Sequence, residues 1–310
     1  MSAIDLETAS DPVEPTPRHR GWFVAVALAA VLSLAVLASV WIMGARGVAL
    51  ALSFTRGQSS SYAMMMTVQG TMDAVGQSMP YDLAMSGTMQ LRVISVSADG
   101  VAEVQEVFSD VQMTSDGKPV DVPADLPSPV LHITTDGRVI ASSGATLFGG
   151  GGTQGPTQIG QDGLSAVLPD EAVSPGDVWT TPVTQTILGT PVTYLARGVY
   201  LRDEPVAGVE SAVVRTTALV PLDLTVPATD VAALVGVAAD ELPAGASFTY
   251  AGEQHVTRTS WIDADASTLV KTTSQGAYTM TMSGQGLPAG ALPPGALTLQ
   301  GTVSMTLERG

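Results

Sequence analysis

The sequence predicts a mainly β (α+β) protein with an N-terminal transmembrane helix. Long, curved antiparallel sheets are expected to follow it, in two half-barrel-like halves packed on one or two helices. Three observations lead to this prediction: residues 21–44 are an unbroken apolar run, residues 81–93 alternate between apolar and polar side chains, and Asp-Gly pairs recur between segments of β character. The 310 residues suffice for one large core or two small ones.

The first 20 residues are polar and acidic, and they contain Pro12, Pro15 and Pro17. A segment of this composition buries too little apolar surface to fold alone. We therefore expect residues 1–20 to be a disordered cytoplasmic tail.

Residues 21–44 contain no charged side chain. As a helix they would span about 36 Å, enough to cross a bilayer core with some tilt. Trp22 and Trp41 stand near the two ends, where aromatic rings favour the headgroup region. A signal peptide cleaved near Ala45 is the alternative, but its small-residue site is missing, because Trp41-Ile42-Met43 occupies that place.

The flanking charges indicate the orientation of this helix. Arg18 and Arg20 precede it and Arg46 follows it, and large C-terminal domains are translocated with little regard to charge. The prediction is a single-pass protein of the cell membrane, with a cytoplasmic N-terminus and an extracytoplasmic C-terminal domain.

Charge and cysteine content exclude several kinds of partner and site. The net charge of −16 argues against nucleic acid as a partner. The chain has no cysteine, so stability must come from burial rather than disulfides, and a lipid-modified cysteine is excluded.

A stalk is expected over residues 45–61, and a first β half over 62–140. Within residues 81–93 every odd position is apolar or Gly, which predicts a strand with one dry face and one wet face. The pattern changes phase at Ile94 and Val96, which indicates a bulge.

Asp-Gly pairs at 99–100, 116–117 and 136–137 predict tight turns, because both residue types tolerate positive φ. Their spacing leaves room for antiparallel strands near 101–114 and 129–135.

Residues 141–168 are expected to be a Gly-rich connection that ends in a short helix over 164–168. Residues 169–310 would form the second β half, with strands near 183–188, 192–202, 209–220, 246–262, 268–283 and 296–308.

One longer helix is predicted near residues 229–242. Thr229 is a suitable N-cap, and Pro243 ends the run. Val231, Leu234 and Val235 would share one face, which we expect to lie against the dry, concave face of the sheet.

No motif supports catalysis. Residues 150–155 match the spacing of a dinucleotide-binding Gly-rich loop but are followed by Pro156 and polar residues instead of a helix. His132 and His255 are far apart in the chain, and no His or Cys pattern of a metal site is present. We expect a protein without enzymatic activity, cofactor or metal.

Methionine is the unusual feature of the composition. Eleven of the 13 methionines lie between residues 64 and 305, nearly all in predicted strands. Met is flexible and polarizable, so a surface rich in it adapts to varied apolar shapes. Ordinary core filling remains the alternative. The candidate cavity lining consists of Met85, Met89, Leu91, Val231, Leu234, Val235, Met280, Met282 and Met305.

Two short motifs carry a family resemblance. Residues 168–179 fit the pattern LP-x-x-x-V-x-x-GD-x-W, and Trp261-Ile262-Asp263 is followed by Leu269-Val270-Lys271. Both resemble motifs of uncharacterised exported proteins, mostly actinobacterial. More distantly, the arrangement is similar to the LolA/LprG-like half-barrels, which implies a lipid- or lipoprotein-handling role. Without that resemblance, Gly176 and Asp177 fit a capped turn and Trp179 fits a core position.

These observations lead to two hypotheses. The first is a membrane-anchored, extracytoplasmic, non-catalytic domain that binds a lipid or another hydrophobic ligand. The second is a structural or protein-interaction domain of the bacterial cell envelope.

Overall fold

The computed structural model describes residues 47–122, 126, 128–143, 166–187, 190–228, 243–286 and 296–310. Two compact units divide the chain, residues 1–46 and 47–310, and all the described residues belong to the second. The predicted tail, the transmembrane helix and the helix near 229–242 lie outside the described residues. Among those that are described, no helix has the length and apolarity needed to span a membrane.

The secondary-structure elements within the described residues are all β-strands. Their bounds are β1 Ser59–Ala74, β2 Gln77–Val96, β3 Ala102–Ser115, β4 Lys118–Val120, β5 Val130–Ile133, β6 Val139–Ser143, β7 Val178–Ile187, β8 Thr190–Val206, β9 Val209–Pro221, β10 Leu224–Pro227, β11 Ser247–Asp263, β12 Thr268–Gln285 and β13 Leu297–Arg309.

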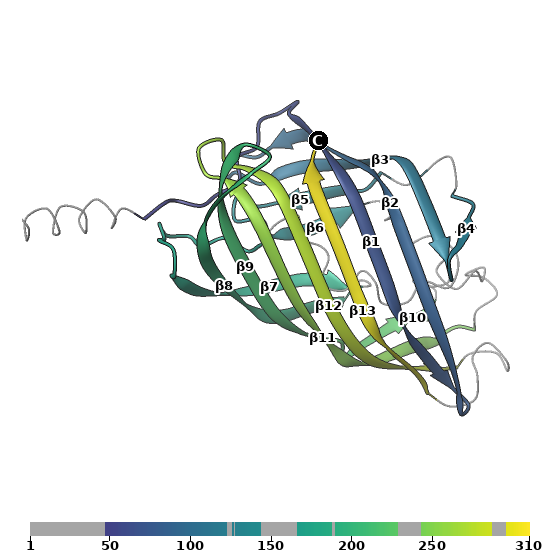
Figure 1. Cartoon of the computed structure of the whole chain (residues 1–310). Helices are drawn as coiled ribbons and strands as arrows, with labels where there is room; N and C mark the ends of the chain where they lie inside the picture. The colour runs from purple at the N-terminus through teal and green to yellow at the C-terminus, as the bar shows by residue number, and fades with distance from the viewer. Residues whose placement is uncertain are drawn as a thin grey trace, which may run out of the picture. The chain divides into compact units, whose positions relative to one another are not determined.

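All the strands belong to one antiparallel sheet, which curls into a nearly closed, barrel-like shape (Figure 1). The order is β6-β5-β3-β2-β1-β13-β12-β11-β9-β8-β7, with β4 beside β3 and β10 beside β11. The two ends of this order, β6 and β7, approach each other. The predicted class of long, curved antiparallel strands is confirmed.

The first and last strands pair with each other. The ladder between β1 and β13 runs from Tyr62 opposite Arg309 to Asp73 opposite Thr298. The two β stretches that the sequence suggests as separate halves are therefore joined in one continuous sheet. A chain that closes on itself in this way leaves fewer unpaired strand edges.

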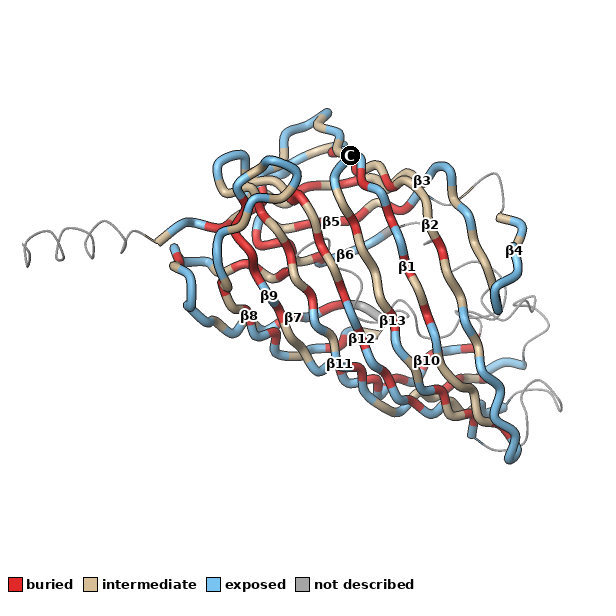
Figure 2. The backbone as a smooth tube through the Cα atoms, in the orientation of Figure 1, coloured by how far each residue is buried: buried red, intermediate tan, exposed pale blue. Residues whose placement is uncertain are grey.

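Along β1 and much of β2, buried residues alternate with more exposed ones, which defines an inner and an outer face of the sheet (Figure 2). In β1, Met64, Met66 and Val68 are buried, whereas their odd-numbered neighbours are exposed or half-buried. The predicted alternation in β2 is confirmed, since Met85 and Met89 are buried on the same inner face. The ladder between β2 and β3 shifts register between Val93 and Ser95, which confirms the bulge.

The Asp-Gly pairs form the expected turns. Gly100, Gly117 and Gly137 each have positive φ, and they lie between β2 and β3, β3 and β4, and β5 and β6. Glycine tolerates this backbone conformation without a steric penalty.

Residues 47–54, expected as part of a stalk, instead pack against the sheet; we call them the strap. Leu50 is 2% exposed, and Leu52 is also buried. The Leu52 amide donates to the Thr135 carbonyl at 2.7 Å, and the Ser53 amide donates to the Ser267 carbonyl at 2.8 Å. The strap therefore joins the turn between β5 and β6 to the turn between β11 and β12, while Leu50 and Leu52 enter the core.

Residues 166–168, expected at the end of a short helix, are not helical. Their amides bond to other strands: Ala166 N–H donates to Ser260 Oγ at 2.7 Å, and Val167 N–H donates to Thr216 Oγ1 at 3.0 Å. These partners replace the carbonyls that a helix would provide.

Candidate ligand-binding interior

The structure places the described members of the predicted cavity lining on the inner face of the sheet. Met85, Met89, Leu91 and Met280 are buried, and Met282 and Met305 are half-buried against the same core. The other three predicted members, Val231, Leu234 and Val235, lie outside the described residues.

Four methionines form a continuous row across neighbouring strands. Met305 lies opposite Met66, Met66 opposite Met85, and Met85 opposite Met113, so the row crosses β13, β1, β2 and β3. We call it the methionine row. Met66 and Met113 were missing from the predicted lining. Met64, Met65 and Met66 are consecutive, so the sequence alone does not show which of them faces the interior.

Several inner-face side chains are only half-buried. Leu83, Ala218, Val256 and Met305 belong to this group, and each lies in register with buried residues of the inner face. These positions are the least tightly covered apolar members of the described inner face.

Two small cavities adjoin the inner face. One of about 30 Å³ is lined by residues that include Val167, Ala218 and Val256, and one of about 40 Å³ lies between the strap and residues that include Tyr62 and Leu269. Spaces of this size hold one or a few waters. A longer guest would need side chains to move, which unbranched Met side chains do readily.

The inner face of β9, β11 and β12 is polar where segment 166–168 meets it. Its buried polar members are Thr216, Gln254, Arg258, Ser260, Thr272 and Ser274. Ser260 and Thr272 are 3.0 Å apart through their hydroxyl oxygens. Segment 166–168 uses this wall for its backbone hydrogen bonds, which lowers the cost of burying both sets of polar groups.

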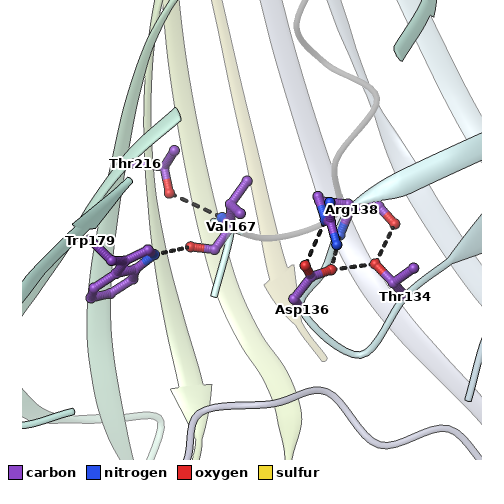
Figure 3. A network of polar contacts seen from close by, with 6 residues as sticks. All are labelled: Thr134, Asp136, Arg138, Val167, Trp179 and Thr216. Atoms are coloured by element: carbon purple, nitrogen blue, oxygen red, sulfur yellow. Dashed lines mark hydrogen bonds and ion pairs between the residues drawn. The ribbon is translucent and has the colours of Figure 1, made fainter. Parts of the chain in front are cut away.

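Figure 3 shows the two side chains, Trp179 and Thr216, that hold Val167 in this segment. The Trp179 indole N–H donates to the Val167 carbonyl at 3.1 Å, and Thr216 Oγ1 accepts from the Val167 amide. On the other side, the Leu168 amide donates to the Asp136 carbonyl at 2.9 Å. The segment is thereby fixed between β7, β9 and the turn that joins β5 to β6.

That turn contains a largely buried ion pair. Arg138 Nε lies 2.6 Å from Asp136 Oδ2, and the Thr134 hydroxyl also donates to Asp136 (Figure 3). A buried carboxylate needs such partners to offset its lost hydration. The arrangement is explained by the turn geometry and implies no chemistry.

The Gly-Asp-x-Trp motif has a structural role. Gly176 has a φ of 98°, and Asp177 Oδ2 accepts the Ser174 amide at 2.8 Å. Trp179 then packs over Gly198 on β8, where an added Cβ would lie 2.2 Å from the indole. The predicted capped turn is confirmed, and Trp179 is half-buried against the core.

A pair of tyrosines was not predicted. The hydroxyls of Tyr81 on β2 and Tyr278 on β12 form a hydrogen bond across the inner face of β1 and β13. Burial raises the pKa of both phenols above the usual value. No local sequence pattern reveals the pair, because the two residues are brought together by closure of β1 on β13.

The described residues contain no group of three or more His, Asp and Glu side chains that could hold a metal ion. His255 lies on the outer face of β11, 3.4 Å from Glu253, and both side chains are exposed.

Comparisons with known proteins give little further guidance. No family model and no curated protein matches the chain. Among solved structures, the chain has 12% identity to a mutant porin of Rh. blastica, with a TM-score of 0.23 over 80% of this chain and 100% of the porin. It also has 12% identity to a DUF1329 family protein from Desulfovibrio piger, with a TM-score of 0.19 over 82% of this chain and 86% of that one. These TM-scores are too low to support a shared fold or function.

Proposed function

We propose that residues 47–310 form a non-catalytic, extracytoplasmic binding domain for a lipid or another hydrophobic ligand, tethered to the cell membrane by residues 21–44. The observation that supports this proposal most directly is the methionine row on an inner face whose members are partly half-buried. A lining of this kind adapts its shape to an apolar guest.

The contrast between the two faces of the sheet supports the same proposal. On the outer face of β12 and β13 the side chains are largely Thr, Ser and Gln, including Thr279, Thr281 and Gln300. The inner face of the same strands carries Met280, Leu299 and other apolar side chains. An apolar ligand gains most by entering the interior, since burial of its surface there removes it from water.

The test is to purify the full chain from a bacterial host and to identify bound molecules by native mass spectrometry and solvent extraction. We expect a co-purifying apolar molecule, and Met305→Gln should lower its occupancy several-fold. The matched control is Met65→Gln, because Met65 is exposed on the outer face of β1. A chain that carries no apolar molecule, and that takes up none when it is offered, would refute the proposal.

A second candidate function is a protein-interaction domain of the cell envelope. Leu195 on β8 and Leu219 on β9 each lie one residue beyond the Ala196–Ala218 pair that ends the ladder between these strands, and they are 64% and 47% exposed. Adjacent exposed leucines are a feature of contact surfaces. Crosslinking that recovers a stoichiometric protein partner and no lipid would favour this candidate, and Leu195→Ser should abolish the crosslink.

A further inference from the structure

Five inner-face residues form a row that crosses the middle of the sheet. Tyr81 lies opposite Gly70, Gly70 opposite Gly301, Gly301 opposite Tyr278, and Tyr278 opposite Gln254. We call it the tyrosine row. It runs parallel to the methionine row, in the same interior but with different chemistry.

The two glycines allow the tyrosine rings to lie across β1 and β13. A Cβ at Gly70 would lie 2.6 Å from Tyr81 Oη, and one at Gly301 would lie 2.8 Å from Tyr278 Oη. Glycine within a strand costs conformational entropy and provides no side chain to pack. The arrangement thus gives up stability while it brings two hydroxyls together in an apolar interior.

Gln254 adds a hydrogen-bond acceptor that is not used within the described protein. The residue is 1% exposed, and its Oε1 has no hydrogen-bond partner. Its Nε2 lies 2.7 Å from where a Cβ would stand on Gly276, the neighbour of Tyr278 on the inner face of β12. The amide therefore reaches the inner face of β12 at Gly276, two residues along the strand from Tyr278. A buried acceptor without a partner is costly, and a bound donor would remove that cost.

We propose that the tyrosine row binds the polar end of an amphiphilic ligand, and that this end is an uncharged hydrogen-bond donor such as a hydroxyl or a primary amide. This inference rests on the proposed function, since it assumes that the apolar part of the ligand lies in the same interior. The polar end of the ligand donates a hydrogen bond to Gln254 Oε1. The hydroxyls of Tyr81 and Tyr278 offer that end further hydrogen bonds, as donor and as acceptor.

The electrostatics of the row favour a neutral end group over an anion. The row contains no cationic side chain, and an unpaired carboxylate is expensive to bury. Burial also raises the pKa of Tyr81, so the phenols stay neutral. The nearest inner-face cation on the same strand is Arg258, about 13 Å further along β11 at the usual rise per residue.

Three compounds with the same chain length test the inference on the full chain in nanodiscs: decane, 1-decanol and decanoate. The protein carries 3-fluorotyrosine, and its six tyrosine resonances are assigned with Tyr→Phe variants. We expect 1-decanol to shift the Tyr81 and Tyr278 resonances at a concentration about tenfold below that of decane or decanoate, the effect of roughly one well-made hydrogen bond. Equal concentrations for decane and 1-decanol would overturn the inference and leave the proposed function standing. So would a preference for decanoate. No saturable shift with any of the three would count against both.

Variants locate the contact. Gln254→Leu and Tyr278→Phe should each remove the preference for 1-decanol over decane while decane still binds. The matched control is Tyr250→Phe, because Tyr250 lies on the inner face of the same strand as Gln254 but outside the tyrosine row. If Tyr250→Phe removed the preference and Gln254→Leu did not, the assignment would be wrong. The wild-type series decides the question even where a variant fails to fold.

Discussion

At the scale of single residues, close approach between a bulky side chain and a glycine recurs on the inner face. Trp179 beside Gly198 and the two tyrosines beside Gly70 and Gly301 follow the same rule: part of an aromatic side chain occupies the place that a Cβ on the neighbouring strand would take. A larger residue at any of these glycines would overlap a side chain in a packed interior.

The Trp179 contact leads to a stability prediction. Gly198→Ala should lower the free energy of unfolding by about 1–3 kcal/mol, because the new Cβ overlaps the indole ring and the surroundings must shift. Trp179→Leu should reduce that cost in the double variant, and urea unfolding of the four proteins measures the coupling. Additive effects of the two changes would contradict the contact.

The Tyr278 phenol leads to a prediction about pH. Burial raises its pKa, and its hydrogen bond with Tyr81 raises it further. A phenol with a raised folded-state pKa contributes stability that is fully present below the unfolded pKa of about 10 and is lost as the pH rises through the folded-state value. The urea midpoint should therefore fall as the pH rises above about 10. Tyr278→Phe should flatten that fall, whereas an unchanged slope would place the titration elsewhere.

At the scale of elements, much of the sheet follows from local sequence. Period-two alternation marked β2, and Asp-Gly pairs marked the turns around β3 and β5, because both features depend on residues close in the chain. The sequence predicted a stalk where the structure has the strap. Leu50 and Leu52 are buried by strands that lie far away in sequence, so no local pattern shows that they belong to the core. The irregular conformation of residues 166–168 likewise depends on Ser260 and Thr216, which no local pattern reveals.

The same limit applies to the candidate site. Met85 and Met280, both named in the predicted cavity lining, are buried on the inner face, because each sits in a strand with clear alternation. The tyrosine row depends on four cross-strand registers at once, and a register is set by the whole sheet rather than by one strand. A feature that forms only when β1 pairs with β13 therefore cannot be predicted from the pattern of any single strand.

The strap gives a prediction at this scale. Leu50→Ala and Leu52→Ala should each cost about 2–4 kcal/mol of unfolding free energy, the usual loss for a buried leucine. Val48→Ala is the matched control, because Val48 is 38% exposed, and it should cost less than either. Urea unfolding of the full chain in detergent measures all three. Equal and negligible effects would mean that residues 47–54 behave as a stalk after all.

At the scale of the whole molecule, the β1–β13 ladder determines how the protein folds. It pairs the beginning of the described sheet with its end, so the contact with the greatest separation in sequence lies in the middle of the strand order. Pairing strands this far apart in sequence requires closing a long loop, which costs chain entropy before the new contacts form. We therefore expect folding to be slow. The same pairing should make folding of the sheet cooperative, because each β stretch has an unpaired edge strand without the other.

This argument predicts that the two stretches cannot fold separately. Residues 47–143 alone would leave the β1 edge unpaired and would remove Met305 from its place opposite Met66, and residues 166–310 alone would leave the β13 edge exposed. Each fragment should lack a cooperative urea transition and should aggregate, as exposed strand edges do. The full chain should unfold in one transition, and hydrogen exchange should protect the amides of β1 and β13 as strongly as those of β2 and β12. Independent, cooperative unfolding of either fragment would show instead that the halves are domains and that the β1–β13 ladder is only an interface between them.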